Sequence, residues 1–460
     1  MHKDVLSRAH EIAQRYLDTV ADRHVGGTAT RAALVEALGG PLPEKPADAL
    51  AVIDAIVEHA DPGIVASAGP RYFGFVTGGA LPVAVAADWL GSAWDQNASL
   101  YVMSPAMAVM EEIVAGWVLE LLDLPRTSGV GFVTGCHMAN FTCLAAARHA
   151  VLRRAGWNVE THGLQRAPRV RVIAGDEAHV TAILALRYLG FGSEEIEVVP
   201  VDGQGRMRAD ALRTMLATGG GPAIVCAQAG NVSTGASDPF DAIVDAAHAH
   251  DAWVHVDGAF GLWAAAVPEL RSQVAGIARA DSWATDAHKW LNVPYDSGIA
   301  IVADAALHRA SMSMKASYLE RGAGEERNGM DWAPESSRRS RVLPLYALVR
   351  ALGREGIADI VRRNCALARR LADQLSSSAG VRVLNEVVLN QVLVQFTDEA
   401  TTRDVIAKVQ AEGTCWAGGA RWQGTQAMRI SVSNWSTTEA DIDRSAKAIL
   451  SAFSLAAGRA

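Results

Sequence analysis

The sequence predicts an α/β fold with a mainly parallel central sheet flanked by helices. Between residues 130 and 305, short runs rich in Val, Ile and Ala alternate with longer helical patterns. These runs are continuously apolar, as in parallel strands buried on both faces, and their alternation with helices indicates crossover connections. The predicted strands are VGFVTG (130–135), RVRVIAG (169–175), IEVVPV (196–201), AIVCAQA (223–229), WVHVDG (253–258), DSWATD (281–286) and GIAIVAD (298–304).

The regions on either side of this alternation have a different character. Residues 1–60 show helical patterns with a polar break, and residues 306–460 combine helices with two strand-like segments, VLNQVLVQF and AMRISVSN. We therefore expect an N-terminal helical segment over 1–60, a large α/β domain over 61–305 and a smaller C-terminal α+β domain over 306–460.

Composition and charge narrow the class of protein. The chain has 460 residues, of which 50% are hydrophobic and 20% charged, as in a globular protein large enough for more than one domain. A net charge of −8 argues against nucleic acid or an anionic membrane as a partner, and no apolar run is long enough for a transmembrane helix. The amphipathic start, MHKDVLSRAHEIAQRYLDTV, lacks the apolar core of a signal peptide. The five dispersed cysteines fit reduced thiols, so we expect a cytoplasmic location.

Chemically reactive side chains follow several of the predicted strands at the point where each strand ends. Ligands of open α/β sheets bind outside the carboxyl ends of the strands, so we expect these side chains to gather at one edge of the sheet. These residues are Thr134, Gly135, Cys136 and His137 at a helix start, followed along the chain by Asp176, Glu177, His179, Gly230, Asn231, Ser233, Thr234, Asp257, His288 and Lys289.

Lys289, within DAHKWLNVP (286–294), is the most informative of these residues. A lysine beside an apolar segment can reach water along its stem, or it can be held inside the protein for chemistry. A helix N-terminus binds phosphate through its N–H groups and its dipole. An amine, a carboxylate and a phosphate site together suit pyridoxal 5'-phosphate, because Lys289 would form the Schiff base and Asp257 would keep the pyridine nitrogen protonated.

Five segments, in this order and spacing, resemble a known family: TGCHMAN, DEAHV, GNVSTGA, HVDGAFG and DAHKW. They look like the pyridoxal-phosphate-dependent decarboxylases of the glutamate and aromatic-L-amino-acid type, which share the aspartate-aminotransferase fold (fold type I). The resemblance runs from about residue 60 to the end of the chain. It implies that the large domain binds the cofactor.

The resemblance also implies roles for individual residues. Lys289 matches the Schiff-base lysine, Asp257 the acid paired with the pyridinium, and His179 the imidazole stacked on the cofactor ring. These three are the expected catalytic residues, and Ala259 matches the small residue on the opposite face of the ring. The other expected cofactor contacts are Thr134, Gly135, Cys136, His137, Asn231, Ser233 or Thr234, Asp286 and His288. Such enzymes are homodimers with the active site at the interface.

The substrate implied by the resemblance is an amino acid. In the dimer, the segment 71–77 would approach it, and an arginine would bind its carboxylate in a bidentate manner. The candidates are Tyr72, Phe75, Thr77, Arg341 and Arg429. The simpler interpretation of Arg338, Arg339 and Arg341 is a solvent-exposed face. We expect no metal site, because i,i+2 residues such as His248 and His250 do not share a helix face.

The chain departs from the family pattern at three places. Cys136 and His137 replace smaller residues of the phosphate loop. Asp286 stands where a phosphate-binding Asn is usual, which would bring an acid near a phosphate. The tyrosine that reprotonates the α-carbon after CO₂ leaves is missing from the loop at about 320–335, and Tyr318 lies before this loop. The polar, Gly-rich segment 320–341 is the predicted mobile loop.

We therefore predict a pyridoxal-phosphate-dependent enzyme that acts at the α-carbon of an amino acid. Decarboxylation through an external aldimine and a quinonoid is the leading hypothesis. Because the loop tyrosine is missing, transamination or Cα–Cβ cleavage of the aldolase type on the same scaffold is the alternative. Two other hypotheses are a dinucleotide-binding oxidoreductase, suggested by GVGFVTG although its spacing is not GxGxxG, and a non-catalytic relative that serves as a scaffold.

Overall fold

The computed structural model describes residues 2–313 and 326–458. The chain forms two compact units. The first unit contains Met1–Thr77, Arg370–Leu384 and Leu393–Ala460, and the second contains Gly78–Arg369 and Asn385–Val392. The domain boundaries expected at residues 60 and 305 stay a prediction. None of the described helices is long and apolar enough to cross a membrane.

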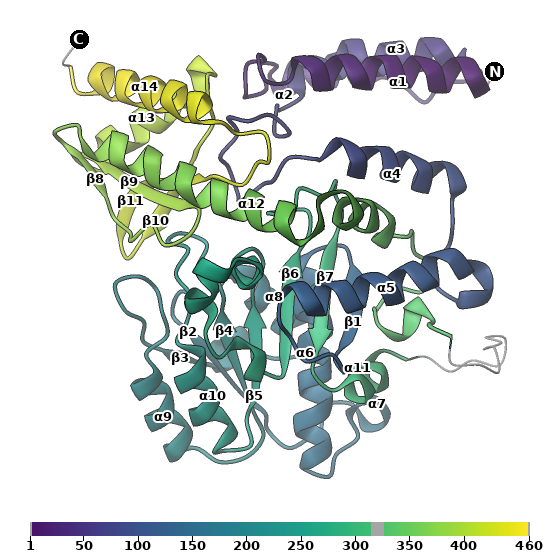
Figure 1. The fold of residues 1–460 in the computed structure, drawn as a ribbon, viewed down its shortest axis with the longest axis vertical. Helices are drawn as coiled ribbons and strands as arrows, with labels where there is room; N and C mark the ends of the chain where they lie inside the picture. The colour runs from purple at the N-terminus through teal and green to yellow at the C-terminus, as the bar shows by residue number, and fades with distance from the viewer. Residues whose placement is uncertain (1, 314–325, 459–460) are drawn as a thin grey trace. The chain divides into compact units, whose positions relative to one another are not determined.

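The second unit is built on a seven-stranded sheet with the order β1-β7-β6-β5-β4-β2-β3 (Figure 1). Its strands are β1 (Gly129–Val133), β2 (Arg171–Gly175), β3 (Ile196–Val199), β4 (Ala223–Gln228), β5 (Trp253–Asp257), β6 (Ser282–Asp286) and β7 (Gly298–Val302). β7 is antiparallel to both of its neighbours, and the other pairs are parallel. The prediction of a mainly parallel central sheet is therefore confirmed, and all seven predicted strands are present.

Helices surround this sheet. The helices of the second unit are α4 (Pro82–Trp94), α5 (Pro105–Leu121), α6 (Cys136–Arg154), α7 (Val159–His162), α8 (Val180–Tyr188), α9 (Ala209–Thr218), α10 (Phe240–His248), α11 (Ala305–Met312) and most of α12 (Val342–Ser376). Short 3₁₀ helices include η2 (Tyr101–Met103), η4 (Gly261–Ala266) and η7 (Gly329–Asp331). The backbone of α12 is broken at Gly353, where φ is 60°.

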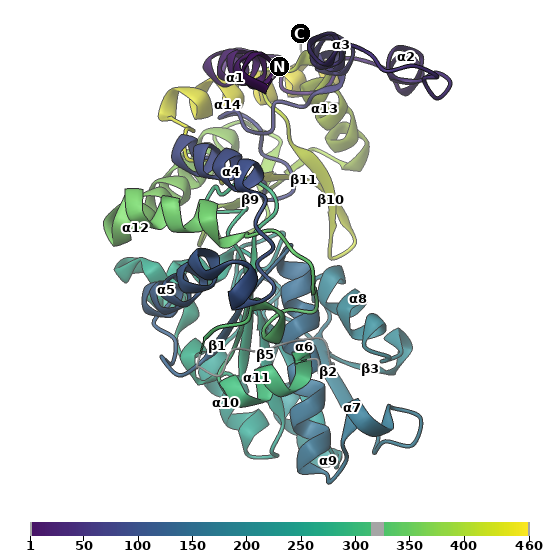
Figure 2. The same cartoon turned by 90° about the vertical axis from the view of Figure 1, so that its right-hand side faces the viewer.

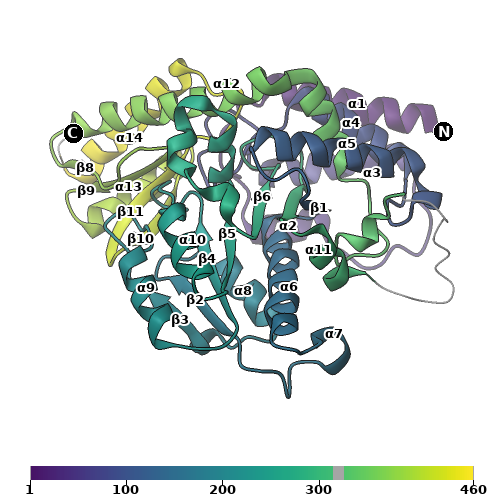
Figure 3. The same cartoon turned by 60° about the horizontal axis from the view of Figure 1, so that its bottom comes forward.

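Helix α6 connects this scaffold to the carboxyl edge of the sheet. It packs on β1, β4, β5, β6 and β7 and lies between α8 and α11 (Figure 3). Its buried residues are mostly small, including Ala145, Ala146 and Ala147, which lets the helix approach the strands closely. Because α6 begins directly after β1, its first turn lies at the edge where the parallel strands end.

The first unit contains helices and a four-stranded sheet with the order β10-β11-β9-β8. Its elements are α1 (His2–Thr19), α2 (Arg31–Leu38), α3 (Ala49–Ala60), η1 (Asp61–Gly63), β8 (Val381–Val383), most of β9 (Gln391–Phe396), α13 (Glu399–Glu412), β10 (Gly418–Trp422), β11 (Thr425–Ser431) and α14 (Glu439–Ala456). Two of these strands, β9 and β11, were predicted. β10 was missed because GGARW is poor in strand-forming residues. It is held in a hairpin with β11 whose turn residues, Gln423 and Gly424, both have positive φ (Figure 2).

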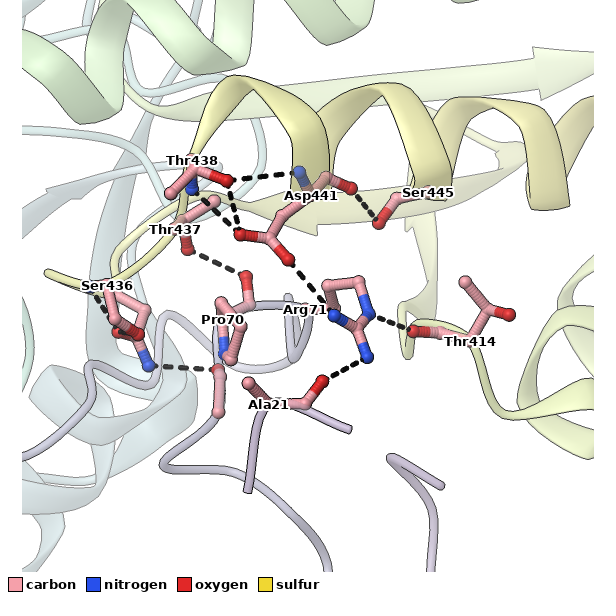
Figure 4. A network of polar contacts seen from close by, with 11 residues as sticks. Ala21, Pro70, Arg71, Thr414, Ser436, Thr437, Thr438, Asp441 and Ser445 are labelled. Carbon is pink, nitrogen blue, oxygen red and sulfur yellow. Dashed lines mark hydrogen bonds and ion pairs between the residues drawn. The ribbon is translucent and has the colours of Figure 1, made fainter. Parts of the chain in front are cut away.

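A buried polar network in the first unit fixes the start of segment 71–77 (Figure 4). Arg71 is buried, donates to the carbonyl oxygens of Thr414 and Ala21, and forms an ion pair with Asp441 at 3.0 Å. Asp441 also belongs to the capping box of α14, with Thr438 as the N-cap residue. Each of the three guanidinium nitrogens of Arg71 thus donates to an acceptor of the protein, so this arginine serves the fold.

A second buried network lies where exposed arginines were expected. Glu111 of α5 accepts hydrogen bonds from Arg338 and, at 3.0 Å, from Arg327, and all three side chains are buried. Arg338 also donates to the carbonyl oxygens of Ala98 and Phe132. The prediction of a solvated arginine face is therefore wrong for Arg338. Residues 320–325 of the predicted mobile loop lie outside the described residues. The described part of that loop includes η7, whose three residues are buried.

We expect Glu111→Gln to lower the free energy of unfolding by about 3–5 kcal/mol, because it leaves two buried guanidinium groups without their carboxylate. The measurement is urea denaturation of the variant and the wild type. Glu112→Gln is the matched control, since Glu112 is exposed and accepts from the backbone N–H of Arg327, a bond that a glutamine oxygen can also accept. Equal stability of Glu111→Gln and the control would contradict the assignment.

Candidate active site

Lys289 follows β6 and is held inside the second unit. Its side chain is 20% exposed, and Nζ lies 3.2 Å from Oδ2 of Asp286. Burial lowers the pKa of Lys289, but attraction to the carboxylates of Asp286 and Asp257 contributes to outweighing burial, so the pKa is raised above its usual value. The alternative in which this amine reaches bulk water along its stem is therefore excluded by the structure.

Lys289 shares a cavity with the other two expected catalytic residues. His179, Asp257 and Ala259 line it together with the amine, and so do residues that sequence reasoning did not single out. The latter are Gln228, Val232 and Phe260, and Gly230 lines the cavity as well. Parallel strand ends thus bring together residues that are far apart in the sequence.

Asp257, the last residue of β5, accepts hydrogen bonds at both of its carboxylate oxygens. Its Oδ1 accepts hydrogen bonds from the backbone N–H of Ala259 at 3.2 Å and from the thiol of Cys136 at 3.4 Å. Its Oδ2 accepts from Nδ2 of Asn140 at 3.1 Å. Burial raises the pKa of Cys136 well above its usual value, so the sulfur remains a thiol that can donate. These donors orient the carboxylate and stabilise its negative charge.

Asp286, the last residue of β6, lies at the N-terminus of α6. Its Oδ1 accepts from the backbone N–H of Cys136 at 2.6 Å. The helix dipole and the unpaired N–H groups of a first turn attract an anion, and here a carboxylate is present. The contact is close because Gly135 and Gly298 lack side chains: a Cβ on Gly298 would come within 2.4 Å of the backbone of Gly135. Asp286 therefore faces Lys289 and α6 instead of pointing away from the site.

His288 and His179 are both fixed by their Nδ1 atoms. Nδ1 of His288 accepts from the backbone N–H of Ser297 at 3.1 Å, and its Nε2 lies 3.3 Å from Oδ1 of Asp286. Burial lowers the pKa of His288. His179 is the N-cap residue of α8, where its side chain accepts from the backbone N–H of Thr181. Capping a helix and lining the cavity are thus compatible in one residue.

The loop after β4 is shaped by Asn231. Oδ1 of Asn231 accepts from the backbone N–H groups of Ser233 and Thr234, at 2.9 and 3.2 Å. The hydroxyl of Thr234 donates to the carbonyl oxygen of Gln204 at 2.7 Å. This bond directs the Thr234 hydroxyl toward Gln204, so of the two candidate hydroxyls Ser233 is the better placed to contact a ligand.

His137 and Thr134 lie on either side of Gly135 and Cys136. The ring of His137 is near that of Tyr188, with 5.6 Å between centroids, and its Nε2 is buried without a hydrogen-bond partner among the described residues. A buried nitrogen without a partner is costly, and a ligand that accepts or donates a hydrogen bond would relieve that cost. Thr134 lies in the turn between β1 and α6.

The substrate candidates are distributed over both units. Arg341 of the second unit is buried and bound to Asp296 at 2.9 Å, so the expectation of an exposed side chain is wrong for this arginine also. The other four candidates belong to the first unit. There Tyr72 stacks on Trp416, and Phe75 is exposed beside the same ring. Burial lowers the pKa of Arg429 on β11. Tyr318 lies outside the described residues.

Asn140 and His255 were missed by sequence reasoning. His255 precedes Asp257 by two residues in β5, so both side chains share one face of the strand. Asn140 follows Cys136 by four residues in α6 and therefore lies on the same face of the helix. These spacings are visible in the segments HVDG and CHMAN. Only the packing of α6 on β5 shows that Asn140 lies against His255 and Asp257.

Comparisons with known proteins agree with this geometry. The family model of the pyridoxal-dependent decarboxylase conserved domain matches residues 33–397. Tryptophan decarboxylase 1 of Oryza sativa subsp. japonica is 31% identical over 332 residues, which are 68% of this chain and 64% of that protein. Human acidic amino acid decarboxylase GADL1 is 29% identical over 325 residues, which are 69% of this chain and 61% of that protein. The matched regions thus span less than two thirds of either relative.

Solved structures extend the similarity over the whole chain. Oryza sativa TDC with PLP and tryptamine has a TM-score of 0.91 and 25% identity and covers 98% of this chain and 97% of that chain. Mouse CSAD has a TM-score of 0.89 at 22% identity, covers 99% of this chain and 98% of that chain, and supports the fold alone. The prediction of fold type I is therefore confirmed.

The site also fits the cofactor that the family name specifies. A buried amine, a fixed carboxylate, the first turn of α6 and the unpartnered Nε2 of His137 supply the groups that pyridoxal phosphate requires. The matching family model and the names of these relatives are those of decarboxylases. The chain belongs to the pyridoxal-dependent decarboxylases, and pyridoxal 5'-phosphate is the cofactor of this family.

Proposed function

We propose that this chain decarboxylates an amino acid at the carboxyl edge of its seven-stranded sheet, with Lys289 as the residue that carries the cofactor covalently. The grouping of Lys289, Asp257 and His179 around one cavity is the observation on which the proposal rests. Bound pyridoxal phosphate supplies an electron sink for the electron pair left on the α-carbon when CO₂ departs. The protein then has to bind and orient the cofactor and the substrate, and to hold or move protons at defined atoms.

The carboxylate of Asp257 would hold a proton on the ring nitrogen of the cofactor. It is suited to this task because its own donors leave it one orientation. His179 and Ala259 line the same cavity and would lie on the two faces of the ring. Thr134, Gly135, Cys136, His137 and Ser233 would contact the phosphate or the ring, while Asn231 and Thr234 shape their loop.

Asp286 and His288 are proposed to serve the amine of Lys289. A protonated amine is not a nucleophile, so Nζ must lose a proton before it reacts. Oδ2 of Asp286, at 3.2 Å, is placed to receive that proton, and Nε2 of His288 lies against the other oxygen. That transfer would also neutralise Asp286 and so remove the repulsion between its carboxylate and a nearby phosphate.

We expect Lys289→Ala to release no CO₂ from any amino acid, while its far-UV circular dichroism matches the wild type, because the amine that lines the cavity is gone. CO₂, keto acids and aldehydes are measured for a panel of amino acids, and borohydride reduction should fix the cofactor on Lys289 of the wild type. Lys408→Ala is the control, since this lysine pairs with Asp404 on the surface of α13. Keto acid or aldehyde without CO₂ from the wild type would refute decarboxylation, and near-normal turnover by Lys289→Ala would refute the role of the amine.

We also propose a homodimer whose interface includes α4, η2 and α5. These elements of the second unit expose eight large apolar side chains, and exposed apolar side chains in such number are typical of an interaction surface. The exposed residues are Val83, Trp89, Leu90, Trp94, Val102, Met103, Val109 and Ile113. The substrate candidates Tyr72, Phe75, Thr77, Arg341 and Arg429 are proposed to act at the interface site. All five cysteines are buried and unpaired, which supports a reducing, cytoplasmic location.

The dimer is tested by sedimentation velocity. The wild type should sediment as a dimer, and Leu90→Glu should shift it toward the monomer because a charge would be buried at the contact. Val198→Glu is the matched control, since Val198 is similarly exposed but lies on the edge strand β3. A monomeric wild type, or equal effects of the two variants, would exclude this interface.

A further inference from the structure

A buried chain of hydrogen bonds ends at Asp257. It links Trp253, Ser282, His255 and Asn140 to the carboxylate, and all four side chains are fully buried. Trp253, His255 and Asp257 alternate along β5 and therefore share the face that α6 covers. Ser282 lies beside His255 on the neighbouring strand, β6, and Asn140 lies above both on α6.

The direction of every hydrogen bond in this chain is determined by its two ends. Nε1 of Trp253 can only donate, and it lies 2.9 Å from Oγ of Ser282. A carboxylate can only accept, so Asn140 must present Nδ2 to Asp257, at 3.1 Å, and Oδ1 to His255. Nε2 of His255, 2.9 Å from that oxygen, must then carry the proton. Nδ1 of His255 accepts from the hydroxyl of Ser282 at 3.0 Å.

The hydrogen bonds on the two sides of His255 require a neutral imidazole. Burial lowers the pKa of His255 to about 4, so the ring is uncharged near neutral pH and has one donor and one acceptor. All donors then point toward Asp257, and each bond polarises the next one. The last bond of the series is the one from Nδ2 of Asn140 to Asp257, and the bond from His255 to Oδ1 of Asn140 fixes the orientation of that amide.

We propose that Asn140, His255 and Ser282 are positioning residues that hold the Asp257 carboxylate against the ring nitrogen of the cofactor. The inference rests on the proposed role of Asp257. These residues do not touch the cavity: they act through Asp257, and their contribution is specific to a ligand with a nitrogen at that place. A residue that only supports the fold would affect ligands with and without that nitrogen equally.

The test compares two ligands of the full-length apoprotein: pyridoxal phosphate and its analogue with carbon in place of the ring nitrogen. His255→Leu removes both the donor and the acceptor of the imidazole. We expect it to weaken pyridoxal phosphate binding by roughly 10- to 100-fold, the scale of a hydrogen bond to a charged group, and to change the affinity for the analogue little. His255→Gln keeps one donor and one acceptor and should restore most of the discrimination.

Further variants separate positioning from folding. Asn140→Leu breaks the chain from α6 instead of β5 and should give the same loss of discrimination. Cys143→Ala is the matched control: Cys143 is equally buried, lies one turn further along α6, and its thiol donates to the carbonyl oxygens of Trp283 and Ile301. Because its thiol takes no part in the hydrogen bonds that lead to Asp257, Cys143→Ala should leave the discrimination between the two ligands unchanged. Circular dichroism of each apoprotein identifies variants that do not fold.

The outcomes separate this inference from the proposed function. Equal weakening of both ligands in His255→Leu and Asn140→Leu, or no change in either ligand, would overturn the positioning role. Binding requires no turnover, so a wild type that discriminates between the ligands but releases no CO₂ would refute only decarboxylation. A wild type that binds both ligands equally would overturn the assignment of Asp257 itself.

Discussion

The ammonium group of Lys289 is largely withdrawn from solvent, with carboxylates beside it, and the rest of the site depends on this electrostatic constraint. An isolated charge inside a protein is unfavourable, so the amine requires Asp286 at contact distance and Asp257 nearby. Those carboxylates are buried too and require donors of their own. The N–H of Cys136 serves Asp286, and Cys136 Sγ, Ala259 N–H and Asn140 serve Asp257.

The fold makes this arrangement possible because two strands end, and one helix begins, at the same edge of the sheet. β5 and β6 deliver Asp257 and Asp286 at the carboxyl edge of the sheet, and α6 begins there. Small residues along α6 and glycines at 135 and 298 allow the helix start to come close enough for a direct hydrogen bond to Asp286. The same close packing places Asn140 between His255 and Asp257.

Asp286 and Cys136 give this site its particular character within the family. The resemblance led us to expect an asparagine at 286 and smaller residues in the loop, and the acid raised the question of repulsion from a phosphate. The geometry offers a physical answer, because Lys289 and the first turn of α6 offset the negative charge. Cys136 retains its proton and becomes a donor to Asp257, a use of a thiol that needs neither metal binding nor oxidation.

The amino-acid sequence by itself determined the central sheet, the cofactor and the positions of Lys289, Asp257 and His179, because strand periodicity and short motifs are local properties. It did not determine that Arg338 and Arg341 are buried, since the carboxylates that make burial possible, Glu111 and Asp296, lie far away in the sequence. β10 likewise depended on its hairpin partner. The hydrogen-bond chain from Trp253 to Asp257 was decided only by tertiary structure, because its direction follows from which side chains meet when α6 packs on β5 and β6.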